Sequence, residues 1–223
     1  MKKALIIFLL ISVTGISNAQ QVENNTKREL PKKGFFGIGI SYLLMSPKIQ
    51  DNMHFVGVGM TGGFYVTPKS SLGFEVRFHG QVNEGEQVGA FEYTSQTGSG
   101  PITRHSDGVI TRTYSSIPIL ATWAYEMNLS EKAYIYVGPT IGVNILSGRN
   151  KYEPAITEGD APENKKNKAT FCYGGNIGLS IEIDNMTSFN IGYKCLGNSD
   201  ISLYHEKYNM VGHHIYVNIN LNF

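Results

Sequence analysis

The chain has 223 residues, of which 41% are hydrophobic, 11% aromatic and 17% charged, and its net charge is +1. This composition excludes a disordered chain, and the lack of any run of 18 apolar residues excludes a bundle of membrane helices. The absence of a basic excess argues against a nucleic-acid partner, and two cysteines are too few for a disulfide scaffold or a Cys-rich zinc site. A Gly- and Tyr-rich all-β chain is left.

The first residues have the pattern of an export signal. Two lysines precede an apolar run of about ten residues, and Ser17-Asn18-Ala19 then offers the small residues that a signal peptidase reads. The run is too short to span a bilayer. We therefore predict a cleaved signal peptide over residues 1–19, a polar, disordered segment over residues 20–33 and a single domain over residues 34–223.

Apolar residues in the remaining chain recur at every second position, which is typical of β-strands. Eight such segments are found, at 34–45, 55–66, 72–79, 109–125, 133–145, 170–182, 188–197 and 210–223. Pro118 falls inside the fourth segment and predicts a β-bulge there, because proline cannot donate to a strand ladder.

The second face of these strands distinguishes a membrane barrel from a soluble sandwich. It carries Gly, Ser, Thr, Asn and Tyr with a few lone charges, whereas a solvated sheet carries mainly Lys, Glu and Thr. Most segments are about 10 to 14 residues long, enough to cross a bilayer at a tilt. We predict an eight-stranded antiparallel transmembrane β-barrel with its apolar face toward lipid. The alternative is a soluble exported β-sandwich, in which the apolar faces would point inward.

The connections between segments also alternate in length. Those after the first, third, fifth and seventh segments hold roughly 7, 25, 24 and 10 residues, and the others about 5, 7 and 5. Outer-membrane barrels have long loops outside and short turns in the periplasm. An even strand number then places both termini in the periplasm. The two longest loops are predicted at Glu84–Asp107 and Arg149–Lys168.

Several short motifs carry a family resemblance. They are Ser116-Ile117-Pro118-Ile119-Leu120, Val137-Gly138-Pro139, Gly174-Gly175-Asn176-Ile177-Gly178, and Ile191-Gly192-Tyr193 followed by Gly197. In these the chain resembles small outer-membrane β-barrels of the OmpX and OmpA transmembrane-domain type, and the porin-like barrels of Bacteroidota, which are Gram-negative.

The resemblance implies a place in the outer membrane, with lipid and lipopolysaccharide as neighbours. The last strand, which ends at Phe223, resembles the signal that the barrel-assembly machinery reads. Although some relatives are called porins, eight strands leave an interior that side chains just fill, so we expect no open pore.

Charged residues on the inward face predict a polar network in the lumen. Its expected members are Glu75, Arg77, His79, Glu182, Lys194 and His214. One interpretation is a catalytic or ion-conducting cluster. We favour the other, in which buried charges pair to fill the lumen and set the strand register.

Other reactive residues give weaker hypotheses. His105-Ser106-Asp107 has the residue types of a nucleophilic site, but it falls in a predicted flexible loop, where preorganisation is poor. His213 and His214 are neighbours on a strand and point to opposite faces, so they do not share a metal ion, while a surface-loop metal site with His205 stays open. We predict no catalytic residue, no metal and no cofactor.

The two cysteines are expected on opposite faces, Cys172 inward and Cys195 outward. A disulfide between them would need a bulge or a shifted register, so we favour two free thiols. Aromatic residues are expected to form interfacial girdles of the barrel, and these are Tyr42, Trp123, Tyr125, Tyr173 and Tyr193.

The predicted function is that of a non-enzymatic surface protein, acting in envelope integrity or in adhesion or ligand contact through its loops. Lysines of the loop 149–168 could pair with lipopolysaccharide phosphates or be ordinary solvated charges. The alternatives are a component of a secretion apparatus, like the PorT-type barrels of Bacteroidota, and a lipid A-modifying enzyme.

Overall fold

The computed structural model describes residues 33–47, 53–82, 85–97, 100–154, 163–199, 201–203, 206–208 and 210–223. The chain divides into two compact units, Met1–Leu30 and Pro31–Phe223, and the described residues all belong to the second. The predicted signal peptide and residues 20–32 therefore lie outside the described residues. In the part of the chain that is described, no helix is long and apolar enough to cross a membrane.

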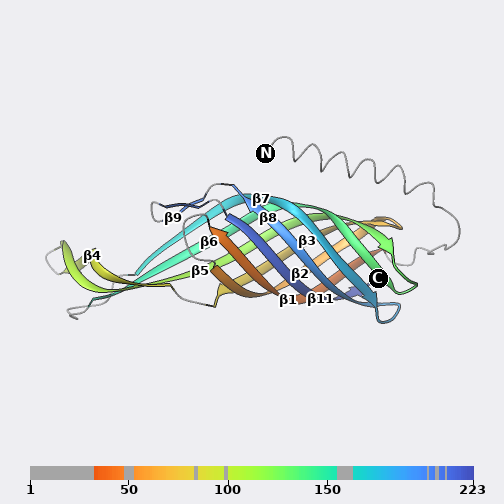
Figure 1. Ribbon diagram of the computed structural model, residues 1–223, viewed down its shortest axis with the longest axis horizontal. Coiled ribbons are helices and arrows are strands. Elements are labelled where there is room, and N and C mark those ends of the chain that lie inside the picture. Colours follow the sequence, from red (N-terminus) through yellow and green to blue (C-terminus); the bar gives the residue numbers. More distant parts are fainter. Residues whose placement is uncertain are drawn as a thin grey trace. The chain divides into compact units, whose positions relative to one another are not determined.

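The described residues form β-strands joined by turns (Figure 1). The strands are β1 (Gly34–Pro47), β2 (Met53–Thr67), β3 (Ser70–Gln81), β4 (Gly85–Thr97), β5 (Gly100–Asn128), β6 (Ala133–Pro154), β7 (Glu163–Glu182), β8 (Thr187–Asn198), β9 (Ile201–Leu203), β10 (Glu206–Tyr208) and β11 (Met210–Asn222).

Eight of these strands close into an antiparallel ring. The order of neighbours is β1, β2, β3, β5, β6, β7, β8 and β11, and β11 pairs again with β1. The ring confirms the predicted eight-stranded barrel and excludes the β-sandwich, since the sheet closes on itself.

The strands of the ring are staggered. Paired residues can be followed once around it, through Met53, Met45, Gly212, Leu196, Gly174, Thr140, Thr122, Gly73 and Gly63. One circuit thus returns to β2 at residue 63 instead of residue 53, a stagger of ten residues. Such a stagger tilts the strands against the barrel axis and sets which side chains share a level in the lumen.

Strand β4 lies outside the ring and extends the sheet at one end (Figure 1). It pairs along its whole length with β5, from Gly85 opposite Arg112 to Thr97 opposite Gly100. Gly100, the first residue of β5, has φ +117°, a conformation that favours glycine. Strands β6 and β7 likewise stay paired as far as Lys151 opposite Glu163.

The prediction of long loops at Glu84–Asp107 and Arg149–Lys168 is therefore wrong over most of their length. Both segments continue the sheet as paired strands, and only residues 155–162 of the second lie outside the described residues. The physical reason is that a strand that continues past the end of the ring has free backbone N–H and C=O groups. A neighbouring segment of the chain can pair with these groups. Thr, Val, Ile and Tyr in these segments favour the extended conformation that pairs with them.

The predicted bulge at Pro118 is also absent. Pro118 lies opposite Asn144 on β6 in unbroken register, and its side chain is fully buried. The β3–β5 ladder skips from Val76–Ile119 to His79–Ser116 without a change of register. The backbone N–H that Pro118 lacks is thus accommodated by a local gap in the β3–β5 ladder. The register does shift between Tyr65 and Thr67, next to the β2–β3 turn.

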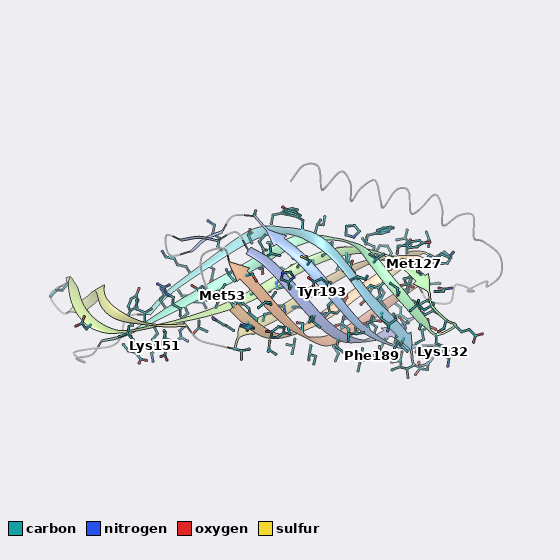
Figure 2. The ribbon with its side chains drawn as sticks, viewed as in Figure 1. Met53, Met127, Lys132, Lys151, Phe189 and Tyr193 are labelled. Atoms are coloured by element: carbon teal, nitrogen blue, oxygen red, sulfur yellow. The ribbon has the colours of Figure 1, made fainter. Side chains whose placement is uncertain are left out.

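The two faces of the ring differ as the alternation predicts. Large apolar side chains on the outside are exposed, for example Ile38 at 60% and Val58 at 60%. The intervening side chains point into the lumen, and many of them are buried Ser, Thr, Asn or charged residues. Figure 2 shows the outward side chains standing away from the ring.

An apolar cluster fills the lumen near the end that carries β4. Its members are Leu43, Met45, Met53, Phe55, Tyr114 and Leu146, all buried, and a smaller cluster of Leu120, Cys172 and Leu196 is also buried. The interior is therefore not only small and polar, as the sequence had suggested. Strands β1 and β2 turn apolar on both faces toward this end, and their inward side chains there are buried in the apolar cluster.

Candidate functional site: the barrel lumen

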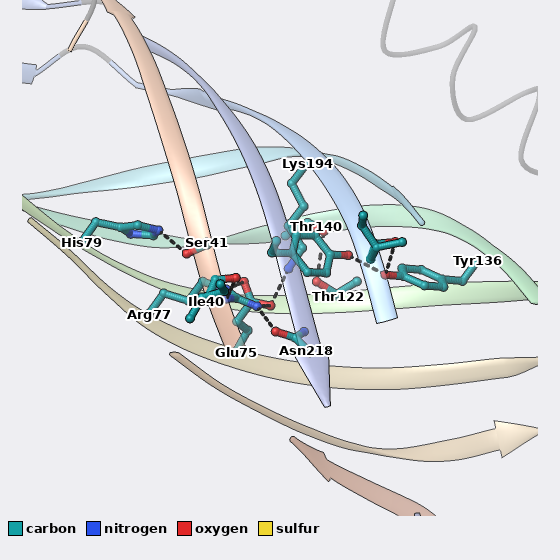
Figure 3. Close-up of polar contacts among 12 residues, drawn as sticks. Ile40, Ser41, Glu75, Arg77, His79, Thr122, Tyr136, Thr140, Lys194 and Asn218 are labelled. Atoms are coloured by element: carbon teal, nitrogen blue, oxygen red, sulfur yellow. Dashed lines mark hydrogen bonds and ion pairs between the residues drawn. The ribbon is translucent and has the colours of Figure 1, made fainter. Parts of the chain in front are cut away.

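A buried ion cluster crosses the lumen (Figure 3). It lies on the side of the apolar cluster that faces the termini of the barrel. The Lys194 ammonium on β8 donates to Glu75 Oε2 at 2.6 Å, and Arg77 on β3 lies with Nε 3.0 Å from Glu75 Oε1. The exposed fraction of each of these three residues is 5% or less. Since β3 and β8 stand four places apart in a ring of eight, the Glu75–Lys194 ion pair joins opposite walls of the barrel.

Two tyrosines extend this cluster. The ring of Tyr216 lies between the cations, with its centroid 5.1 Å from Arg77 Cζ and 4.6 Å from Lys194 Nζ. Its hydroxyl is 3.0 Å from that of Tyr136 on β6. Cation–π contacts of this kind stabilise cations that have left water. A second acceptor, Asn218 Oδ1, receives the Arg77 guanidinium at 2.7 Å.

His79 and His214 lie between the ion cluster and the apolar cluster. Their rings meet edge to face with centroids 5.1 Å apart, and His79 Nε2 is 2.8 Å from Ser41 Oγ. All three residues are buried. A serine hydroxyl beside an imidazole is a nucleophilic arrangement in an accessible site, but here both groups are enclosed by the lumen filling.

Inward glycines make room for the large side chains of the cluster. A Cβ added at Gly59 would overlap the Arg77 side chain, and one at Gly57 would overlap His79. Gly39 stands in the same relation to Asn218. The large side chain therefore lies flat on the glycine of the neighbouring strand. This explains in physical terms why glycines alternate with apolar residues along the strands.

A small cavity opens on the other side of the ion cluster, toward the end where the chain termini of the barrel lie. Its volume is about 80 Å³. Its wall includes Glu75, Lys194, Asn176, Asn218 and Tyr136. A space of this size and polarity suits a few water molecules.

Five of the six residues predicted for the lumen network come together, namely Glu75, Arg77, His79, Lys194 and His214. Glu182 does not join them, because it is the last residue of β7, six residues or about 20 Å along the strand from Asn176, which pairs with Lys194. Tyr136, Tyr216, Asn218 and Ser41 were missed as members. The alternation of the sequence already predicted that their side chains point inward. It could not show that these residues lie at the same height along the barrel axis as the ion cluster.

The other candidate residues lie on the face of the barrel wall that the alternation along their strands predicts. His214 is buried inside and His213 lies outside, where Tyr193 OH is 2.6 Å from its Nδ1. Cys172 is buried, Cys195 is half-buried, and both thiols are free as predicted. Among the described residues, no group of three or more His, Cys, Asp or Glu could hold a metal ion; His205 lies outside these residues.

The sequence His105-Ser106-Asp107 lies within β5 instead of a flexible loop, and its residues pair in that order with Glu92, Phe91 and Ala90 of β4. The side chains of His105 and Ser106 are not among those described. The weak hypothesis of a nucleophilic site at this motif therefore gains no support from the described strand pairing.

Comparison with known proteins supports the fold. No family model matches the chain, and no curated protein matches it. Among solved structures it is similar to the Neisserial surface protein A (NspA), with 10% identity over 85% of this chain and 97% of that one and a TM-score of 0.54. It is also similar to Ail, the attachment invasion locus protein of Yersinia pestis, with 9% identity over 86% and 99% and a TM-score of 0.48.

The closed ring and the likeness to NspA define the class: the chain has the fold of a small outer-membrane β-barrel. Its architecture is of the OmpX and OmpA-like type that the sequence predicted. An origin in Bacteroidota stays a prediction.

Proposed function

We propose that this protein is an integral outer-membrane β-barrel without an open pore, with a structural or surface-binding role and no enzymatic activity. The observation that carries the proposal is the combination of an apolar outer wall with a lumen closed at two levels. The apolar cluster blocks one level, and the Glu75–Lys194 ion pair spans the other. A wall of this kind is stable in lipid, and a lumen so filled leaves no channel.

The outer wall supports insertion into a bilayer. Its exposed apolar residues include Ile40, Val58, Ile177 and Ile219, which come from four different strands of the ring. Tyr42, Tyr173 and Tyr193, three of the predicted girdle residues, are exposed on the same outer face. Aromatic residues at the border of an apolar wall are typical of membrane interfaces.

The termini of the barrel support the proposed orientation. Phe223 lies beside Gly34, and its carbonyl accepts hydrogen bonds from the amides of Lys33 at 2.6 Å and Gly34 at 2.9 Å. Short turns, such as that between β2 and β3, lie at this same end. We infer that this end faces the periplasm, and that Phe223, whose side chain is 68% exposed, is read by the barrel-assembly machinery.

The extension built from β4 and the adjoining parts of β5, β6 and β7 would then project outside the cell. A paired sheet is a more rigid platform than a loop, which favours a role in adhesion or ligand contact. The edges of the same extension also suit a protein partner, so a PorT-like role in a secretion apparatus is the second candidate. A stable protein partner in mild detergent extracts would favour that candidate.

Heat-modifiability tests the main proposal. The membrane fraction is dissolved in mild detergent and run on an SDS gel before and after boiling. A closed barrel resists SDS unboiled, so we expect a change of mobility on boiling and recovery in the outer-membrane fraction. A protein that is recovered in the soluble fraction and shows no shift would contradict the proposal.

A further inference from the structure

The outer wall carries two matched tyrosine–histidine pairs near its end away from the chain termini. Tyr193 OH on β8 donates to His213 Nδ1 on β11 at 2.6 Å. In the same way, Tyr42 OH on β1 donates to His54 Nδ1 on β2. Within the described parts of these four strands, the two histidines are the only outward side chains that contain a nitrogen atom. The pairs therefore stand out from a wall that is otherwise mainly apolar.

The two pairs flank an apolar strip. In the strand ladders, Leu44 lies opposite His213 on one side and opposite His54 on the other. Ile215, which is 53% exposed, lies in the same way between the two tyrosines. The histidines are thus two strand spacings apart, about 10 Å between their Cα atoms. One acyl chain can lie along this strip with a histidine on either side.

The tyrosine hydroxyls determine which ring nitrogen of each histidine carries the proton. We assign each hydroxyl as the donor to Nδ1, which places the ring proton on Nε2. The reverse assignment would leave Nε2 as a bare acceptor beside lipids, whose esters and phosphates are acceptors too. Among the described residues, neither Nε2 has a hydrogen-bond partner. An unpaired donor on a lipid-facing wall costs free energy, so each Nε2–H needs an oxygen acceptor from outside the protein.

The height of the pairs on the wall indicates where that oxygen comes from. His213, Leu44 and His54 lie within three residues of the ends of β11, β1 and β2, on the side away from the termini. Three residues of a tilted strand rise by less than about 10 Å. The imidazoles are therefore at the border of the apolar wall, where lipid head groups begin, and exposed apolar residues such as Ile40 lie next to the acyl chains.

We propose that the two tyrosine–histidine pairs form a binding site for one lipid A molecule of the outer leaflet. Its ester and phosphate oxygens accept hydrogen bonds from Nε2 of His54 and His213, and one acyl chain lies over Leu44 and Ile215. This inference rests on the proposed function, because it needs this end of the barrel to stand in the outer leaflet. It assigns a single lipid to a defined place on the wall, which a general preference of aromatic residues for the interface does not.

Native mass spectrometry tests the site. The full barrel is folded into phosphatidylcholine vesicles that contain diphosphoryl lipid A, released into mild detergent and weighed intact. The wild type should retain one lipid A molecule per barrel. The variant His54→Phe/His213→Phe keeps two rings and removes both donors. We expect its retained fraction to fall about tenfold, as the loss of two uncharged hydrogen bonds implies.

The matched control is Tyr173→Phe, because Tyr173 is exposed on the same outer wall but stacks on Phe171 instead of a histidine. This control should retain lipid A as the wild type does. Equal retention by the wild type and the double histidine variant would overturn the site. Retention of phosphatidylcholine in place of lipid A would overturn lipid A as its ligand.

The mobility shift on boiling separates loss of folding from loss of lipid. If the double histidine variant has lost the shift, Tyr42→Phe/Tyr193→Phe replaces it, since this variant removes only the two hydroxyls. We expect it to retain less lipid A, because the ring protons are no longer held on Nε2, and unchanged retention would overturn the site. Failure of the wild type to float with the vesicles would instead contradict the proposed function.

Discussion

Two ion pairs in this protein have the same length and very different surroundings. Lys194 Nζ lies 2.6 Å from Glu75 Oε2 with side chains 3% and 6% exposed, and Lys151 Nζ lies 2.6 Å from Glu153 Oε1 with both side chains 52% exposed. Water screens the second pair and leaves it little net energy. The first pair is buried inside the barrel, so removing one partner leaves a buried charge without its counterion.

We therefore expect Lys194→Met to lower the free energy of unfolding by about 3 to 5 kcal/mol. The control Lys151→Met should change it by about 0 to 1 kcal/mol. Urea titration of the barrel in detergent micelles, followed by the fluorescence of Trp123, gives both values. Similar effects of the two substitutions would show that the lumen pair is screened by water.

A matched pair of glycines tests the close packing of the lumen wall. A methyl group at Gly59 would overlap the Arg77 side chain, whereas one at Gly80 meets no atom within 4 Å. We expect Gly59→Ala to destabilise the barrel by about 1 to 3 kcal/mol, because the methyl group would also lie 2.7 Å from the Val76 carbonyl oxygen, so that both Arg77 and the β2–β3 backbone have to shift. Gly80→Ala should be tolerated in the same urea titration. A tolerated Gly59→Ala would mean that Arg77 and the strand backbone can both shift at little cost.

At the scale of the strands, β5 serves two structures at once. Its residues from Ser115 to Tyr125 pair with β3 and close the ring, while those from Gly100 to Arg112 pair with β4 in the extension. The two parts of one strand therefore differ in their importance for the barrel. The local gap at Pro118 interrupts the ring ladder without shifting it.

This division predicts that the β4 hairpin can be removed. Replacing residues 86–107 with a short Gly-Ser linker leaves every β3–β5 and β5–β6 pair in place, so the protein should keep its heat-dependent mobility shift. Long insertions and deletions at such sites cost little loop entropy. Loss of the shift would show that the hairpin is needed for assembly. The same gel on the full chain is the reference.

For the whole molecule, the filled lumen predicts that the barrel conducts no ions. The apolar cluster around Phe55 and the ion cluster around Glu75 occupy the lumen at separate levels. Purified protein in a planar bilayer should therefore show no stepwise conductance, and Leu43→Ala/Phe55→Ala should stay silent because the ion cluster still spans the lumen. Discrete channel openings of the wild type would contradict a closed barrel.

The sequence by itself determined the faces of the strands. Apolar residues at every second position predicted the outward wall, the inward charges and the opposite placements of His213 and His214, because side-chain direction along a strand is a local property with a period of two. The class of fold followed from the kind of residue on the second face. For the same reason, the local pattern could indicate that Tyr216 points inward but not what it contacts.

Only the tertiary structure decided which inward residues meet. Glu75 and Lys194 are 119 residues apart and contact each other because eight strands close with a stagger of ten residues. The alternation of the sequence likewise predicts an inward side chain for Glu182, but this residue lies too far along its strand to reach the ion cluster. The extension of β5, β6 and β7 beyond the ring was likewise hidden, since a strand end can continue only where a neighbouring strand offers hydrogen bonds. Partner, level and length depend on ladders between distant segments, and no local periodicity contains that information.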